Sequence, residues 1–216
     1  VTTIGARAFS LCFNLTEIDI PSSVTAIGES AFEGTHIASL TIPSSVKELG
    51  SGFVKGCYLL TEITIPSSIT SSPDEAFSSC EQLTSITLPS TITSIGDQAF
   101  YGCCSLTEIK IPSSVTTIGK TIFGGLFDRL TKIEFDGTYE QWSSISKDSN
   151  WLCDGYGRYY VTDITCSDGK FCINHTLDKI EAKDKTCTED GIKFDYWKCS
   201  VCGACFSDAN GDNFLY

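Results

Sequence analysis

The sequence lacks methionine and is poor in histidine and in basic residues. Its 216 residues include 15 lysines and arginines against 27 aspartates and glutamates, a net charge of −12. A surface of this charge without a basic stripe repels phosphate backbones, which argues against nucleic acid as a partner. No apolar run approaches 18 residues, so no membrane insertion is expected. The absence of methionine even at position 1 indicates a fragment, whose signal and anchor would lie outside it.

Catalytic motifs are also absent. His36 and His175 are the only histidines, so a triad of nucleophile, histidine and acid would have to use one of them. The sequence contains no GxGxxG, GxSxG, HExxH or phosphate-loop pattern. No cleft that would hold a pair of catalytic carboxylates is evident. We therefore expect a protein that is not an enzyme.

What the sequence does contain is a repeat that runs from residue 1 to about residue 135. The segment IPSSV begins at Ile20 and returns four times, once as IPSSI and once as LPSTI, at steps of 22, 23, 23 and 23 residues. Five of the six prolines occupy one phase of this repeat: Pro21, Pro43, Pro66, Pro89 and Pro112. A phenylalanine recurs at a second phase: Phe9, Phe32, Phe53, Phe77, Phe100 and Phe123.

Each unit is expected to place a strand before its proline, because proline ends strands rather than continuing them. In LTEIDI from Leu15 and its equivalents, alternation directs positions four and six inward and positions three and five outward. A second apolar pair follows in VTAIG and its equivalents, and its glycine is expected to turn the chain. One unit cannot bury its apolar side alone, whereas stacked units bury it between neighbours. The pattern predicts a mainly β solenoid with parallel strands.

The consensus IPSSVTSIGxxAFxxCxxLTEI resembles the leucine-rich repeats of BspA-like surface proteins, over about 60% of the chain. The resemblance implies a right-handed solenoid over residues 1–135 that is displayed outside the cell. It also implies adhesion, with an unidentified host or matrix protein or glycan as the partner of a monomeric chain. Two departures, Thr35 in place of a cysteine and a shifted Phe53, predict a slight irregularity.

The outward positions of the strands form two rows that a partner would meet. Their side chains are short, polar and non-aromatic, whereas binding hot spots favour Trp, Tyr and Arg. The rows are therefore either a solvated sheet face or a binding face. The candidate binding residues are Glu17, Asp19, Glu62, Thr64, Thr87, Glu108, Lys110, Lys132 and Glu134. The alternative function is a structural spacer that displays other domains of a larger surface protein.

Four cysteines share one repeat phase: Cys12, Cys57, Cys80 and Cys103. Their equivalence predicts inward thiols that pack in the core as small hydrophobic groups. Identical neighbours in register direct their Cβ atoms alike, which disfavours disulfides between them. Cys104 is expected to face outward or to pack at the edge of the repeats.

Residues 136–172 are predicted to cap the last repeat, whose end would otherwise be apolar. Thr138 and Gln141 have the form of a capping box at the start of a short helix. Trp142 and Trp151 are interpreted as cap core rather than as a sugar platform. The segment YVTDITCSDGKF predicts two strands joined by a turn at Asp168 and Gly169. FDGTYEQWSSISKDSNW also resembles the element that often ends BspA-like arrays.

Residues 173–216 are predicted to form a small cysteine-rich β module similar to a zinc ribbon. Such a small unit has a physical motive for a metal staple. The spacing of His175, Cys187, Cys199 and Cys202 suits a closed tetrahedral site, so structural zinc is the candidate cofactor. A disulfide from Cys202 to Cys199 or Cys205, or free thiols, are the alternatives, and a redox-active CxxC lacks a βαβ context. The segment also resembles a short module near the C-termini of secreted proteins of gut Firmicutes.

Overall fold

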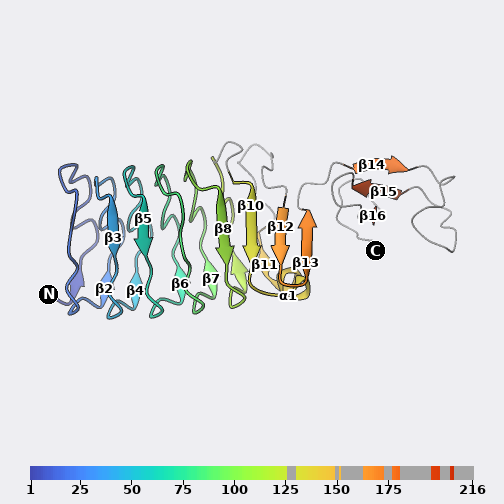
Figure 1. The fold of residues 1–216 in the computed structure, drawn as a ribbon. Coiled ribbons are helices and arrows are strands. Elements are labelled where there is room, and N and C mark those ends of the chain that lie inside the picture. Colours follow the sequence, from blue (N-terminus) through green and yellow to red (C-terminus); the bar gives the residue numbers. More distant parts are fainter. Residues whose placement is uncertain are drawn as a thin grey trace.

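The chain winds into a row of stacked coils that ends in a cap (Figure 1). This computed structural model describes residues 1–125, 130–148, 151, 163–172, 177–180, 196–199 and 205–206. We number the coils 1 to 6 by the phenylalanine that each contains: Phe9, Phe32, Phe53, Phe77, Phe100 and Phe123. Almost all regular structure consists of short strands, which confirms the predicted mainly β solenoid.

Two ladders of strands run along the coils. The front ladder consists of β3 (Ser39–Thr41), β5 (Glu62–Thr64), β8 (Glu108–Ile111), β10 (Lys132–Phe135), β12 (Asp163–Cys166) and β13 (Gly169–Cys172). The rear ladder consists of β1 (Thr3–Ile4), β2 (Ala26–Ile27), β4 (Glu48–Leu49), β6 (Ser71–Ser72), β7 (Ser94–Ile95), β9 (Thr117–Ile118) and β11 (Ser146–Lys147). The strand pairs are parallel, except that β12 and β13 form an antiparallel hairpin.

The front ladder continues through coil 4 by single bridges, from Thr64 to Thr87 and from Thr87 to Lys110. The strand predicted from Leu15 is not formed, and that prediction was wrong. Coil 1 has a described neighbour on one side only, where the amide of Ala38 donates to the carbonyl of Thr16 at 3.4 Å. A strand needs a row of such partners, so the end coil stays irregular.

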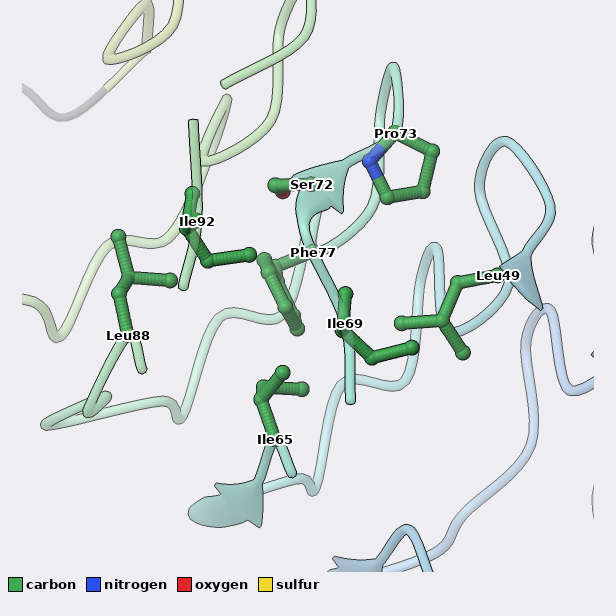
Figure 2. Close-up of a pocket in the computed structure, with 8 residues that line it drawn as sticks. All are labelled: Leu49, Ile65, Ile69, Ser72, Pro73, Phe77, Leu88 and Ile92. Carbon is green, nitrogen blue, oxygen red and sulfur yellow. The ribbon is translucent and has the colours of Figure 1, made fainter. Parts of the chain in front are cut away.

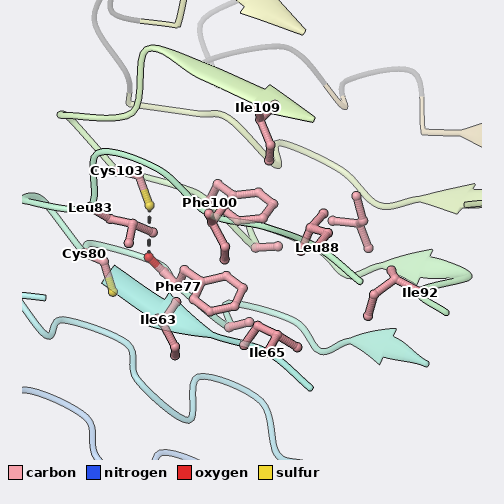
Figure 3. Close-up of a cluster of buried hydrophobic side chains, with 14 of the residues drawn as sticks. Ile63, Ile65, Phe77, Cys80, Leu83, Leu88, Ile92, Phe100, Cys103 and Ile109 are labelled. Carbon is pink, nitrogen blue, oxygen red and sulfur yellow. Dashed lines mark hydrogen bonds between the residues drawn. The ribbon is translucent and has the colours of Figure 1, made fainter. Parts of the chain in front are cut away.

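The core is a column of phenylalanine rings between the two ladders. Phe77 stacks on Phe100 at 5.3 Å between ring centroids, and Phe100 stacks on Phe123 at 5.8 Å. Isoleucine, leucine and valine side chains from both ladders surround the rings (Figure 3). The column explains the phenylalanine phase of the repeat, because each ring covers the apolar face of the next coil.

Serine and threonine hydroxyls tie each coil to the one before it. At the second serine position of the IPSSV segment, Ser68 donates to Val46 O at 2.5 Å and Ser114 donates to Ile92 O at 2.6 Å. Threonines that flank the strands do the same, as Thr93 does to Thr70 O. The serines and threonines of the repeat therefore have a structural role, because their hydroxyls donate hydrogen bonds to backbone carbonyls of the neighbouring coil.

The glycines after the rear-ladder strands permit close approach of the coils. A Cβ built on Gly50 would lie 2.2 Å from Glu29 N, and one on Gly28 would lie 2.5 Å from Ala6 N. Gly96 and Gly119 have the same constraint. Their backbone is not in the left-handed region, so they serve contact between coils rather than the turn that the sequence suggested.

The rear ladder is interrupted between β4 and β6. Gly50, Gly96 and Gly119 each donate a backbone N–H to the preceding coil at 2.8 to 2.9 Å. Coil 4 has Pro73 at this phase, and proline has no N–H to donate. Beside it, Ser72 occupies the buried position that isoleucine or leucine fills in other coils, and it borders a cavity of about 10 Å³ (Figure 2). This irregularity lies in coil 4, whereas the sequence predicted one at Thr35 and Phe53 in coils 2 and 3.

Three of the four cysteines at the shared phase point inward. Cys57, Cys80 and Cys103 are fully buried, and burial raises the pKa of each thiol. Each thiol donates to a carbonyl of the preceding coil, as Cys103 does to Phe77 O at 3.1 Å (Figure 3). Cys12 is exposed, so its predicted burial was wrong, because among the described residues coil 1 has a neighbouring coil on one side only. Cys104 is half-buried.

The cap continues both ladders. Its helix α1 (Tyr139–Ser144) begins with the predicted capping box of Thr138 and Gln141. Strand β11 then pairs with β9, and β12 pairs with β10. Trp151 packs edge-on against Phe123 at 6.4 Å and against Trp142 at 5.7 Å, which confirms the tryptophans as cap core. The predicted hairpin is confirmed by the pairing of β12 with β13.

A separate antiparallel sheet contains β14 (Leu177–Ile180), β15 (Tyr196–Cys199) and β16 (Cys205–Phe206). The predicted boundaries at residues 135/136 and 172/173 stay predictions. Among the described residues, no helix has the length and apolar character to cross a membrane.

Candidate functional site

The front ladder and the irregular segment of coil 1 bring the predicted binding residues onto one surface, which we call the front face. Glu17 and Asp19 lie on coil 1, where no strand of the front ladder is formed. Its outward side chains lie in two rows in strict register, with Thr64 beside Thr87 and Thr87 beside Lys110. Glu108 lies opposite Lys132, and Lys110 lies opposite Glu134. The nine candidates are all exposed or half-buried: Glu17, Asp19, Glu62, Thr64, Thr87, Glu108, Lys110, Lys132 and Glu134. Their role in binding stays a prediction.

The part of the front face on coils 1 to 4 is acidic. Glu17, Asp19 and Glu62 are its charged side chains, and serine and threonine occupy the other outward strand positions. Within the described part of the chain, none of these three carboxylates has a hydrogen bond or an ion pair. This region therefore presents negative charge that is available to a partner.

The part on coils 5 and 6 is charge-balanced. Lys110 pairs with Asp136 at 2.9 Å, and Lys132 pairs with Glu134. The hydrogen bond from Lys110 to Asp136 raises the pKa of Lys110, and the one from Lys132 to Glu134 raises the pKa of Lys132. Opposite charges also alternate across the strands, which stabilises the register rather than attracting a partner of one sign.

An aromatic edge borders the acidic region and was not found from the sequence. We give this name to the four residues Phe13, His36, Tyr58 and Leu59, which lie in the loops that lead into the front ladder. Phe13, His36 and Tyr58 each directly follow the cysteine phase of their coil, and this shared phase was the available signal. The rings of Phe13 and His36 lie 5.9 Å apart at 46°. The same phase holds Glu81 in coil 4 and Cys104 in coil 5, so the aromatic row ends at coil 3.

The predicted zinc ligands fall mostly outside the described residues. His175, Cys187 and Cys202 lie there, and Cys199 is the last residue of β15. The structure therefore does not test whether the four side chains meet. Within the described ranges, no group of three or more histidine, cysteine or acidic residues has the arrangement of a metal site.

Comparison with known families assigns the solenoid. Six copies of the BspA type leucine rich repeat region match residues 2–141. The chain belongs to the BspA-type leucine-rich repeat family. The family match begins in coil 1 and ends inside helix α1, so it includes all six coils that the phenylalanines mark.

Solved structures of leucine-rich repeat proteins have a similar fold. A leucine-rich repeat protein from Bacteroides ovatus is 26% identical, with a TM-score of 0.57, over 77% of this chain and 47% of its own. A leucine rich repeat protein of T. pallidum is 29% identical, with a TM-score of 0.58, over 62% of this chain and 66% of its own. The chain thus spans between about half and two thirds of these relatives. No curated protein matches it.

Proposed function

We propose that this BspA-type chain is a non-catalytic binding module at the cell surface that holds a host or matrix protein or glycan across the front face. The register of the front ladder carries the proposal, because it places charged and hydroxyl side chains at regular intervals on one exposed surface. No enzymatic family is indicated, and leucine-rich repeat solenoids typically serve as interaction scaffolds. The resemblance to BspA-like surface proteins supports the extracellular location.

The front face is suited to an extended partner. Its rows cross from coil to coil without a bulky side chain, so a glycan or a protein surface could lie along them. The described pocket at Ser72 opens between core side chains rather than on this face, so it offers no competing ligand site of useful size (Figure 2).

A structural spacer is the second candidate. The elongated row of coils and its continuous hydrogen bonding between coils favour it, because a stiff rod holds other domains apart (Figure 1). A spacer predicts no saturable ligand for this chain and a function that depends on the number of coils.

Binding to immobilised matrix proteins and to a glycan array tests the proposal. We expect saturable binding that charge reversal, Glu62→Lys or Lys110→Glu, weakens about tenfold or more. Both side chains are exposed, so both variants should fold normally. Glu48→Lys on the rear ladder is the matched control and should bind like the unmodified chain. Absence of saturable binding, or equal losses in all three variants, would favour the spacer.

The zinc site stays a prediction. Elemental analysis of protein purified without a metal-affinity column should find about one zinc per chain, and His175→Ala should lose it. A metal-free chain whose thiols are paired and unreactive would contradict the zinc site and indicate a disulfide instead.

A further inference from the structure

The aromatic edge contains a group of large, exposed apolar residues on coils 1 to 3. The side chains of Phe13, Tyr58 and Leu59 are 54%, 46% and 48% exposed, although each is large and apolar enough to favour burial. Scattered apolar residues need no explanation, but a contiguous group on a monomer commonly marks an interaction site. Adjacent coils place this group in one row, with the rings of Phe13 and His36 in contact.

Two acidic residues of the front face follow the aromatic edge closely along the chain. Glu17 follows Phe13 by four residues, and Glu62 follows Tyr58 by four residues. An extended chain advances roughly 3.3 Å per residue, so the Cα atoms of each pair lie within about 13 Å of each other along the coil. Asp19 adds a third negative charge on coil 1, and no basic side chain occupies an outward strand position of coils 1 to 4.

The combination of exposed aromatic side chains and carboxylates without ion pairs indicates which class of partner fits this surface. Aromatic rings at the centre of an interface supply most of the binding energy, while charge complementarity supplies orientation and a fast approach. A cationic partner would find carboxylates without ion pairs here, whereas Lys110 and Lys132 on coils 5 and 6 already have acidic partners. An acidic or purely polar partner would match neither part of this surface.

We propose that the aromatic edge and the acidic residues beside it form a docking site for a basic, amphipathic polypeptide segment. Phe13, Tyr58 and Leu59 contact its apolar side chains, and Glu17, Asp19 and Glu62 pair with its lysines and arginines. The inference rests on the proposed function, because it names the partner class and the anchor for the same side of the molecule. It places the residues that contribute most of the binding energy on the aromatic edge of coils 1 to 3 rather than on the strand rows.

Selection of a random-peptide display library on the full chain tests this site. We expect enriched peptides that combine several lysines or arginines with aromatic or aliphatic residues. The affinity of a synthetic copy of the best peptide is then measured against variants. The double variant Phe13→Ser/Tyr58→Ser should weaken binding by roughly 30-fold or more, and Glu62→Gln by roughly threefold to tenfold.

Matched controls separate this inference from the broader proposal. Glu81→Gln alters the same phase on coil 4 and Glu48→Gln alters the rear ladder, so both should leave peptide binding unchanged. Unchanged thermal unfolding midpoints of the variants would show that they fold. Enrichment of acidic peptides, failure to enrich any, or full binding by the double variant would overturn the inference. Loss of binding in Lys110→Gln with retention in the double variant would keep the front face and reject the edge.

Discussion

In the rear ladder, most coils contact the preceding coil through a glycine, whereas coil 4 contacts coil 3 through Pro73. At the glycine junctions the backbones approach so closely that a Cβ would lie 2.2 to 2.5 Å from an atom of the preceding coil, and an N–H crosses the gap. At Pro73 the N–H is missing, the rear ladder is interrupted, and Ser72 leaves a cavity behind it.

The two kinds of junction hold adjacent coils together through different contacts. The interrupted rear ladder does not separate coils 3 and 4, because Phe53 and Phe77 still meet edge-on at 5.7 Å and β5 still bridges to Thr87. Close backbone contact in the rear ladder is therefore one of several bonds between coils. The phenylalanine column and the front ladder hold the array together where that contact fails.

The largest effect should follow from adding one methyl group at a glycine junction. Gly50→Ala would place a Cβ against Glu29 N and Gly28 C, which are backbone atoms that cannot move aside. We expect the coils to separate, the bond from Gly50 N to Ile27 O to weaken, and the free energy of unfolding to fall by roughly 2–4 kcal/mol. Chemical denaturation measures this loss.

Gly5→Ala is the matched control, since Gly5 has the same phase in coil 1 but no atom lies within 4 Å of the place that its Cβ would take. Its stability should change by less than about 0.5 kcal/mol. Equal losses at Gly5 and Gly50 would mean that the repeat needs glycine for backbone conformation rather than for contact between coils.

The sequence predicted what depends on a single coil. The proline and phenylalanine phases and the inward and outward alternation follow from strand geometry, and they located the core and the front face. The hairpin was also predicted, although its turn lies at Ser167 and Asp168 rather than at Asp168 and Gly169. The capping box at Thr138 was likewise readable, because its hydrogen bonds are local.

The sequence did not predict what depends on contact with the next coil. Cys12 shares its phase with buried cysteines but is exposed, because phase alone does not tell whether a neighbour is present. The role of Gly50 and the consequence of Pro73 both require the distance between coils. The aromatic edge was missed because Phe13, His36 and Tyr58 differ in identity, and only stacking makes them one row.

Contacts of Lys147 within the cap that covers coil 6 predict an effect of intermediate size. The ammonium group of Lys147 donates to the carbonyls of Trp142 at 2.5 Å and Ile145 at 3.2 Å, and it lies 4.8 Å from the Trp142 ring centroid. Burial lowers the pKa of Lys147 to about 8. The unfolded chain therefore retains this proton between about pH 8 and 10.5, where the folded chain has released it.

Stability should consequently rise with pH in that window, because the unfolded state binds more protons there. Relative to Lys147→Met, we expect a gain of roughly 1–2 kcal/mol between about pH 8 and 10.5, after allowance for solvent screening. Below about pH 8 the difference should be flat. The buried thiols act in the opposite direction above about pH 9, since their pKa values are raised, but they are common to both proteins. Lys120→Met, on the exposed surface, should not reproduce the effect.

The smallest effect should come from repairing the Pro73 junction. Ser72 is 4% exposed, and its hydroxyl has no hydrogen-bond partner among the described residues. Ser72→Val removes that unsatisfied group and directs two methyl groups toward Ile69, Phe77 and Ile92 (Figure 2). We expect the free energy of unfolding to rise by about 1 kcal/mol, measured by chemical denaturation. Ser71→Val, on the exposed side of the same strand, should not raise it. A loss of stability in Ser72→Val would show that Pro73 sets the coil spacing too tightly for a larger side chain, so that the serine is an adaptation to the proline rather than a defect beside it.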